Sequence, residues 1–336
     1  MRRAGGVLTP EIIDIRQFDA SQFLPLLQAE SRVWDASLRW DYTASVRLIS
    51  SCLEEKRLQG YALIYAREIK GYSFFFYEGE KGLIGNLFVE PDAGGLHQAL
   101  RLLEHVIETV TAIPGINRVE TQLPHFHFDE LNPCFVAHQF QGYQRRFMAV
   151  SLTDWKPRGR RDMAGLDAAA QGTGTNFGDF VIVPWDRKHD HHAALMLYQT
   201  YMNHVDAVIN DQYASGAGAS RLIENIMHQR GCGEHLPQAS QVAIHRATGK
   251  IAGVLALTSV RAHTAHIPQI AVAREFQGTG LGTAMMELSF EDLSRRGFHE
   301  VSLTVTDLNV GAVRLYERMG FENFRTFGAF VWNRLA

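Results

Sequence analysis

The sequence predicts an α+β protein made of two tandem copies of one unit, each an α/β/α sandwich with a mixed, mostly antiparallel sheet flanked by helices. Two observations support this fold class. Short runs of β-branched and aromatic residues alternate with segments of helical period, and the order is the same in both halves. Residues 87–91 resemble residues 270–274, and residues 140–143 resemble residues 318–321. We therefore interpret the chain as a duplication.

A break in this pattern separates the halves. Residues 156–178 are rich in Gly, Arg, Ala and Thr and lack a sustained apolar period, so we expect a linker there. The expected domains are residues 1–155 and 179–336, and residues 1–10 are expected to be a mobile start.

The elements of the first half follow from apolar spacing. Phe23, Leu26 and Leu27, for example, fall on one side of a helix. In chain order we expect a strand at 12–16, helices at 21–33 and 45–58, strands at 61–66, 71–77 and 83–89, a helix at 96–111, a strand at 118–123, a short helix at 132–139 and a strand at 143–152.

The second half repeats this order. We expect a strand at 180–183, helices at 191–204 and 220–228, strands at 241–245, 251–257 and 266–272, the main helix at 280–296, a strand at 301–306, a helix at 310–319 and a long strand or hairpin at 322–332.

Composition indicates an ordinary globular protein. Of the 336 residues, 46% are hydrophobic and 21% charged, and the net charge of −3 predicts no general affinity for nucleic acid or an anionic membrane. No apolar run approaches the roughly 18 residues of a membrane span. The scattered cysteines Cys52, Cys134 and Cys232 form no CxxC and are expected to be free thiols in a reducing compartment. We expect a cytoplasmic monomer or homodimer without nucleic-acid or membrane partners.

Residues 269–282 are the most informative stretch. A short apolar strand leads through a polar turn and a glycine-rich loop into a helix. The first N–H groups of a helix are unpaired and lie at the positive end of its dipole, where a glycine loop allows a phosphate to approach. A P-loop would need a lysine after the last glycine, and a dinucleotide-binding turn would need G-x-G-x-x-G. Neither occurs here, because Gly278, Gly280 and Gly282 alternate and Thr283 follows.

The pattern that does occur is [QR]-x-x-G-x-[GA], from Gln277, Gly280 and Gly282. It resembles the pyrophosphate-binding motif of the GNAT superfamily of acetyl-CoA-dependent N-acetyltransferases. The resemblance includes the preceding Ile-Ala-Val strand and a second signature downstream, Asn309-x-x-Ala-x-x-Leu-Tyr316-x-x-x-Gly-Phe. It implies two GNAT-like domains. The first half lacks the glycine motif, and we interpret it as a degenerate copy.

The resemblance implies acetyl-CoA as co-substrate, a primary amine as acceptor and direct attack without a covalent enzyme intermediate. The cysteines lie outside the motifs, in keeping with direct attack. The residues implied in cofactor binding are Ile270, Ala271, Val272, Gln277, Gly278, Thr279, Gly280, Leu281, Gly282, Thr283 and Asn309.

Tyr316 is implied as the general acid that protonates the leaving thiolate. Many relatives carry a carboxylate just before the Ile-Ala-Val segment, where this chain has Pro268 and Gln269. His266, two residues before Pro268 and on the same face by alternation, is the candidate base. A water chain reaching His263, Glu234 or Asp211 remains an equal alternative.

The acceptor is expected to bind between the first two helices of the second half. Residues 201–220 form either this site or simply a polar loop. Its candidate substrate-binding residues are Tyr201, Asp211 and Tyr213, and the same segment holds His204, Asp206 and Asn210.

Two other functions remain open. One is a CoA-binding sensor without transfer activity, favoured by the missing carboxylates at positions 268 and 269. The other is a protein-lysine acetyltransferase, which differs only in its acceptor. No metal is expected: the histidines at 189, 191 and 192 do not share one helix face, and no ligand partner lies nearby at ligand spacing.

Overall fold

The computed structural model describes residues 9–153, 155, 167–168, 174–229 and 232–334. The chain forms two compact units, residues 1–145 with 326–336, and residues 146–325. It passes from the first unit to the second within β6 (Gln141–Ser151) and returns within β15 (Glu322–Asn333). Most of the expected linker at 156–178, and residues 1–8 of the expected mobile start, lie outside the described residues. The expected domain limits stay a prediction.

The first unit contains a sheet in the order β1-β2-β3-β4-β5-β15. Pairing is antiparallel from β1 to β4, parallel between β4 and β5, and antiparallel between β5 and the end of β15. The elements are β1 (Glu11–Asp14), η1 (Ile15–Gln17), α1 (Ala20–Leu38), α2 (Thr43–Glu54), β2 (Gln59–Tyr65), β3 (Glu68–Glu78), β4 (Lys81–Val89), η2 (Pro91–Ala93), α3 (Gly95–Ala112), β5 (Arg118–Gln122) and α4 (Phe128–Ala137).

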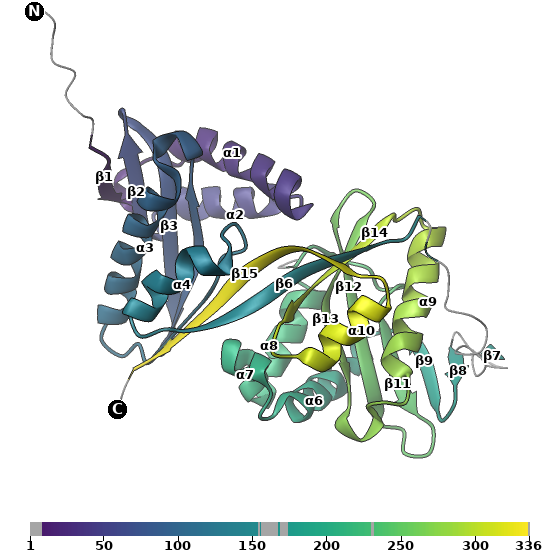
Figure 1. The fold of residues 1–336 in the computed structure, drawn as a ribbon. Coiled ribbons are helices and arrows are strands. Elements are labelled where there is room, and N and C mark those ends of the chain that lie inside the picture. The colour runs from purple at the N-terminus through teal and green to yellow at the C-terminus, as the bar shows by residue number, and fades with distance from the viewer. Residues whose placement is uncertain (1–8, 154, 156–166, 169–173, 230–231, 335–336) are drawn as a thin grey trace, which may run out of the picture. The chain divides into compact units, whose positions relative to one another are not determined.

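This sheet is covered on both faces, as its alternating side chains require. Leu63 packs with α3 in one core, whereas its neighbour Ala62 packs with α1 and α2 in another. Successive residues of a strand point to opposite faces, so the two cores lie on opposite sides of the sheet. Figure 1 shows α1 and α2 on one side of these strands and α3 on the other. The α/β/α sandwich predicted for this unit is confirmed.

The second unit contains β14-β13-β12-β11-β9-β8-β7, with the later part of β6 beside β14, and β10 pairing with β12. The elements are β7 (Asp167–Ala168), β8 (Thr175–Phe177), β9 (Phe180–Pro184), η3 (Arg187–His189), α6 (Asp190–Tyr201), α7 (Val205–Ile209), η4 (Asp211–Ala214), α8 (Gly216–Met227), β10 (Glu234–His235), β11 (Gln241–His245), β12 (Ile251–Arg261), β13 (Thr264–Val272), η5 (Arg274–Phe276), α9 (Leu281–Arg295), β14 (Glu300–Thr306) and α10 (Val310–Arg318).

The second sheet is also covered on both faces. Leu255 packs in the core with α9, and its neighbour Val254 packs in the core with α6 and α8. The helix expected at 191–204 ends instead at Tyr201, because Asn203 takes a left-handed conformation with φ 61°. The chain restarts in α7, where the His204 side chain caps the new helix. This break places residues 201–214 in short segments beside the end of β13.

Among the described residues, no helix combines the length and the apolar character needed to cross a membrane.

Candidate functional site

The site begins where two parallel strands separate. β13 and β14 are paired from Thr264–Glu300 to Ile267–Leu303. The next residue on β13 is Pro268, which has no N–H and cannot donate to the ladder. The opposite edge of β13 remains paired with β12 as far as Gly253–Val272. The edge of β13 at residues 269–272 therefore keeps its extended shape without pairing to β14.

A glycine turn follows this strand. Gly278 and Gly280 have φ values of 80° and 83°, which residues with a side chain rarely adopt. Helix α9 starts at Leu281, and its first helical bond runs from the Ala284 N–H to the Gly280 carbonyl. Within the described part of the chain, no group accepts a hydrogen bond from the N–H groups of residues 278–283. The turn thus presents consecutive donors at the positive end of a 15-residue helix.

Space in front of these donors suits an anionic ligand. A Cβ added at Gly278 would meet nothing within 4 Å, and one at Gly280 would meet only the Phe177 ring, at 3.6 Å. Two side chains of the turn stabilise it. The Gln277 side-chain amide donates to the Val272 carbonyl at 3.1 Å, and the Thr279 hydroxyl donates to the Phe276 carbonyl at 2.8 Å. These residues fit a pyrophosphate held by backbone amides.

Helix α10 carries the second predicted signature. The Asn309 side chain accepts a hydrogen bond from the Ala312 N–H at 3.3 Å and so caps this helix. Tyr316 is buried, and its ring packs edge-to-face on Phe321. Burial raises the pKa of the Tyr316 hydroxyl above its usual value, with smaller contributions from Tyr201 and Asp206. The hydroxyl therefore stays protonated and can donate.

Arg146 fixes the start and end of this helix segment. Its guanidinium donates to the Asp307 carboxylate at 2.6 Å and to the Glu317 carboxylate at 3.1 Å. Asp307 follows β14 and Glu317 follows Tyr316, so this one side chain ties α10 to the end of the strand.

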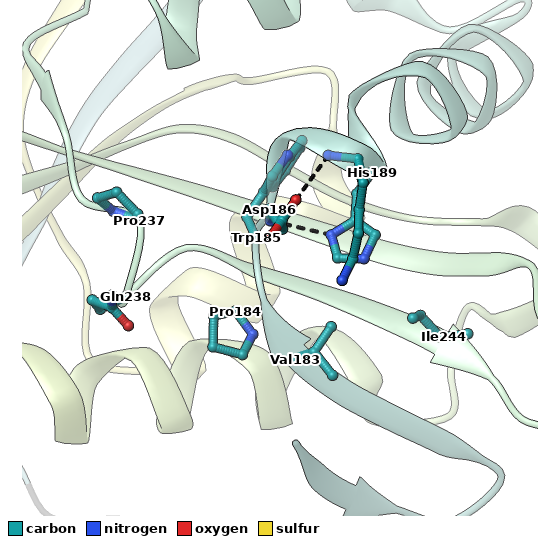
Figure 2. A pocket seen from close by; sticks show the side chains of 9 residues that line it. Val183, Pro184, Trp185, Asp186, His189, Pro237, Gln238 and Ile244 are labelled. Atoms are coloured by element: carbon teal, nitrogen blue, oxygen red, sulfur yellow. Dashed lines mark hydrogen bonds between the residues drawn. The ribbon is translucent and has the colours of Figure 1, made fainter. Parts of the chain in front are cut away.

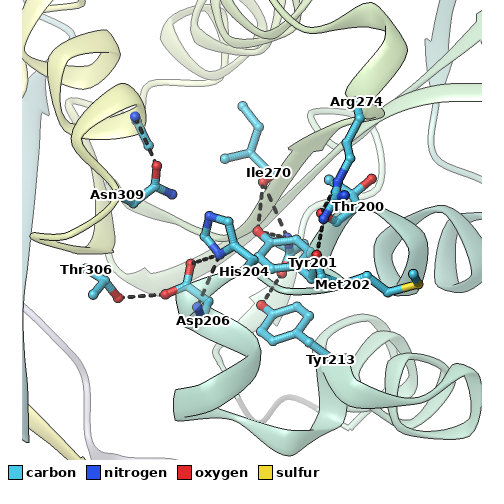
Figure 3. Close-up of polar contacts among 12 residues, drawn as sticks. Thr200, Tyr201, Met202, His204, Asp206, Tyr213, Ile270, Arg274, Thr306 and Asn309 are labelled. Atoms are coloured by element: carbon cyan, nitrogen blue, oxygen red, sulfur yellow. Dashed lines mark hydrogen bonds and ion pairs between the residues drawn. The ribbon is translucent and has the colours of Figure 1, made fainter.

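Two tyrosines form a wall beside the end of β13. The rings of Tyr201 and Tyr213 stack with centroids 4.1 Å apart. Gln269 links them: the Tyr213 hydroxyl donates to Gln269 Oε1 at 2.6 Å, and Gln269 Nε2 donates to the Tyr201 hydroxyl at 3.0 Å and to the Ile270 carbonyl at 3.3 Å. Figure 3 shows Tyr201 lying between Tyr213 and Ile270. The sequence identified both tyrosines but not the bridging role of Gln269. The only signal for that role was a polar residue in an apolar strand.

A carboxylate lies close to the same tyrosine wall. The Thr306 hydroxyl donates to Asp206 Oδ1 at 2.6 Å, and Asp206 Oδ2 lies 3.5 Å from His204 Nδ1. The His204 ring packs edge-to-face on Tyr201 (Figure 3). Sequence reasoning did not identify Thr306, because nothing local relates it to a residue 100 positions earlier. Asp211 begins η4, two residues before Tyr213.

The candidate bases lie along β13. His266 is buried where β13 and β14 are still paired, and its Nδ1 shares a hydrogen bond with Ser302 Oγ at 2.9 Å. The register with β12 shifts between His266 and Gln269, so side chains do not alternate strictly through this part of the strand. His263 precedes β13 and stacks on His299. Six residues of extended chain, roughly 20 Å, separate His263 from Gln269.

Comparison with known proteins identifies this arrangement. A sequence model of the Acetyltransferase (GNAT) family matches residues 210–321, which contain both the glycine turn and α10. Residues 210–321 therefore carry the sequence pattern of the GNAT family.

Three curated N-acetyltransferases match this chain over short segments. The [ribosomal protein bS18]-alanine N-acetyltransferase of Escherichia coli strain K12 is 38% identical over 73 residues, 22% of this chain and 49% of that protein. An uncharacterised N-acetyltransferase of Methanocaldococcus jannaschii is 41% identical over 58 residues, 17% of this chain and 26% of that protein. N-alpha-acetyltransferase 30 of Schizosaccharomyces pombe is 28% identical over 68 residues, which are 20% of this chain and 45% of that protein. The chain thus spans at most about half the length of these relatives.

Solved structures match the fold over nearly the whole chain. A GCN5-related N-acetyltransferase from Sphaerobacter thermophilus has a TM-score of 0.64 at 15% identity and covers 97% of each chain. A tandem GNAT protein from the clavulanic acid biosynthesis pathway has a TM-score of 0.59 at 15% identity, covering 97% of this chain and 98% of that one. The predicted tandem GNAT fold is confirmed.

Other reactive groups of the chain lie outside the site. Burial raises the pKa of the Cys134 and Cys232 thiols to about 11, so both are protonated near neutral pH. Asp190 accepts a hydrogen bond from the Trp185 indole and pairs with His228. In the described ranges, no three His, Cys, Asp or Glu side chains are grouped to hold a metal.

A separate hollow of about 480 Å³ lies at the end of β9. Figure 2 shows its lining, which includes Trp185, Asp186, His189 and Gln238. The Asp186 N–H donates to His189 Nδ1 at 3.1 Å, and Asp186 in turn accepts from the Lys188 N–H at 2.9 Å, so these groups cap η3. None of the residues predicted for the site lines this hollow.

Proposed function

We propose that the second unit is an N-acetyltransferase that moves an acetyl group from acetyl-CoA to a primary amine by direct attack. One observation carries the proposal: a turn with free amides at residues 278–283 follows the unpaired edge of β13, in a chain that also presents the buried Tyr316 hydroxyl. The match of residues 210–321 to the GNAT family model supports it.

The cofactor-binding roles divide among three elements. The amides of residues 278–283 would hold the pyrophosphate, and the edge of β13 at Ile270, Ala271 and Val272, which does not pair with β14, would pair with the pantetheine arm as an added strand does. The Ile270 and Val272 carbonyls already accept bonds from the Gln269 and Gln277 side chains, so each would use its second lone pair. Asn309 uses its side-chain oxygen to cap α10, so its amide nitrogen is the group that would contact the cofactor. Acetyl-CoA, when bound, supplies the thioester that is attacked.

Tyr316 would act on the leaving group. As the amine nitrogen bonds the carbonyl carbon and the C–S bond breaks, the sulfur takes negative charge. An ordinary thiol has a pKa of about 8.5, and burial raises the pKa of Tyr316 above that of free tyrosine. Proton transfer to the sulfur is thus uphill, and hydrogen-bond donation to the thiolate is the role that the tyrosine can best perform. Solvent then protonates the sulfur.

The proton of the attacking amine needs an acceptor. Pro268 and Gln269 cannot serve, and Gln269 is already bonded to both tyrosines. His266 remains a candidate, although its Nδ1 is bonded to Ser302. We propose that the proton leaves through ordered water, with His266 and Asp211 as possible ends of that path.

The amino terminus of a protein is a second candidate acceptor. Two relatives carry names that specify such chemistry, the ribosomal-protein alanine N-acetyltransferase and the N-alpha-acetyltransferase. A protein lysine would differ in the length of the chain between the amine and the backbone. We propose that the first unit is a degenerate copy that supports the fold and does not transfer acetyl groups.

Thiol release from acetyl-CoA tests this function. The purified chain is incubated with acetyl-CoA and a panel of small amines, lysine peptides and peptides with free amino termini, and products are identified by mass spectrometry. We expect thiol release with at least one class and acetylation of its amine. Tight CoA binding without thiol release over the whole panel would contradict an enzyme and favour a CoA sensor.

A further inference from the structure

We infer that Asp206 holds the ammonium group of the acceptor, and that the acceptor is a cationic amine with no carboxylate beside that amine. This inference rests on the proposed function, because it places the acceptor in the same site. It names a residue and a substrate class that the sequence motifs do not.

The Asp206 carboxylate is fixed in place. The Thr306 hydroxyl, at the end of β14, donates to Oδ1 at 2.6 Å. Asp206 itself lies in the first turn of α7, so the bond joins the acceptor segment to the strand that separates from β13. The side chain is 19% exposed, so it can reach a ligand without being freely solvated. A carboxylate held in this way is preorganised for a charged partner.

The second oxygen, Oδ2, faces an acceptor nitrogen. The Asp206 backbone N–H donates to His204 Nδ1 at 3.1 Å, so in the neutral ring the proton is on Nε2. Although Oδ2 lies 3.5 Å from Nδ1, that nitrogen has no proton to give it. Oδ2 therefore keeps its lone pairs for another donor, and an ammonium group offers three N–H donors.

The surroundings suit an amine on an apolar or aromatic body. The His204 ring packs on Tyr201, which stacks on Tyr213 and forms a flat wall beside the carboxylate. Asp206 and Tyr201 both contribute to the raised pKa of Tyr316, which places the three groups near one another.

The charges of this segment argue against a carboxylate on the acceptor. Residues 189–220 contain no Lys or Arg, and their acidic residues are Asp190, Asp206 and Asp211. Arg274, the cation of the adjoining turn, is bonded to the carbonyls of Thr200 and Met202. A carboxylate next to the amine would meet the negative charge of Asp206 and no cation of residues 189–220. Free α-amino acids are disfavoured, whereas simple amines and peptide amino termini are accepted.

Binding of a matched pair of probes tests the inference. Phenylalaninamide and phenylalanine both carry an α-ammonium group, but only phenylalanine carries a carboxylate. Their affinities are measured by NMR titration on the CoA-saturated chain at neutral pH. We expect the amide to bind at least tenfold more tightly than the acid. Loss of one charge-assisted pair in Asp206→Asn should weaken amide binding by about ten- to hundredfold.

Two further variants serve as controls. Glu224→Gln removes an exposed carboxylate from α8 of the same unit and should change neither affinity. Thr306→Val removes only the hydroxyl that fixes Asp206 and should weaken amide binding by a few-fold. CoA affinity within twofold of wild type shows that each variant is folded.

Thiol release, measured separately, distinguishes the two proposals. If the amide binds through Asp206 but no amine of the panel gives thiol release, the inference holds and the proposed function fails. If transfer occurs but Asp206→Asn binds phenylalaninamide like wild type, the inference fails alone. Equal binding of the two probes to wild type, or binding of neither, also overturns it.

Discussion

The two units of the chain repeat one backbone plan and differ in the side chains placed on it. In each unit two parallel strands are paired over four residues, Lys81–Ile84 with Arg118–Thr121, and Thr264–Ile267 with Glu300–Leu303. A register shift with the preceding strand follows, and then a buried amide side chain, Asn86 or Gln269. The duplication predicted from residues 87–91 and 270–274 thus extends to the bulge and the amide beside it.

The amides have different partners. Asn86 donates to Glu30 Oε1 at 2.7 Å, and Glu30, which is fully buried, also accepts from the Tyr72 hydroxyl and the Trp34 indole. The groups of this polar cluster form hydrogen bonds with one another within the first unit. Gln269 instead bridges two half-buried tyrosines. The same strand position therefore serves internal packing in one copy and the candidate site in the other.

The turns after these strands differ as well. In the first unit η2 leads directly to Gly94, where an added Cβ would lie 2.8 Å from the Gln98 side chain, and only the next glycine, Gly95, has open space. In the second unit the longer turn leaves open space in front of Gly278 and Gly280. The two units share the strand pattern, so this pattern alone does not indicate which unit binds a cofactor. The turn after the strand and the partners of the buried amide are the features that distinguish the units.

The largest expected effect is on CoA affinity, and it should differ between substitutions in the two glycine turns. Gly280→Glu places a β-carbon at φ 83° and a negative charge among the free amides, and we expect it to weaken CoA binding by at least about a hundredfold. Gly95→Glu is the matched control, because Gly95 also has positive φ and open space but starts a helix of the first unit. Fluorescence titration with CoA should show no change for this control. Equal losses in both variants would mean that the difference between the turns is not functional.

Carboxylates placed at the two amide positions should have unequal effects on stability. Asn86→Asp puts a second buried negative charge next to Glu30, and we expect the free energy of unfolding to fall by about 3 kcal/mol. Gln269→Glu keeps the acceptor for Tyr213 and should cost about 1 kcal/mol. Urea unfolding measures both. A larger loss for Gln269→Glu would show that the second unit has the more tightly closed network.

Tyr316→Phe tests the leaving-group role. Removing the hydroxyl that we propose stabilises the thiolate should lower kcat at least about tenfold and leave CoA affinity within threefold. His138→Phe, directly after α4 in the segment of the first unit that resembles this one, should leave kcat unchanged. Steady-state thiol release measures kcat, and CoA titration measures the affinity for CoA. A normal kcat in Tyr316→Phe would show that the tyrosine has no part in the mechanism.

The smallest expected effect is on pH dependence. The pKa of Tyr316 is raised, so its neutral form is favoured in the folded chain. Its contribution to stability is fully present below about pH 10, the pKa of free tyrosine, and is lost as pH rises above that value. Thermal unfolding between pH 9 and pH 11 should therefore show a smaller decrease in Tm for Tyr316→Phe than for wild type. An equal decrease would indicate that the tyrosine is not buried in solution.

Most of the fold could be predicted because it depends on local pattern. Alternation and helical spacing indicated the order of elements, and the glycines at 278, 280 and 282 marked the turn before α9. The partners of β15 could not be predicted: its residues 329–333 pair with β5, about 210 positions earlier, and no local signal specifies such a partner. The helix expected at 191–204 stops early for a similar reason, since Asn203 in a left-handed conformation leaves no clear mark in a polar segment.

For the candidate site, too, the residues in local motifs could be predicted, whereas the contacts between distant residues could not. The glycine turn, Asn309 and Tyr316 carry a motif, and the structure shows their positions on one turn and one helix. The bonds that join Gln269 to Tyr213 and Thr306 to Asp206 span 56 and 100 positions. Those bonds depend on the folded arrangement of β13, β14 and α7, which spacing alone cannot give.

The stoichiometry of CoA binding tests the central contrast most directly. Isothermal titration of the full chain with CoA should give one site per chain, which disappears in Gly280→Glu and persists in Gly95→Glu. Two equivalent sites per chain, or a single site that survives Gly280→Glu, would contradict the assignment of cofactor binding to the second unit alone.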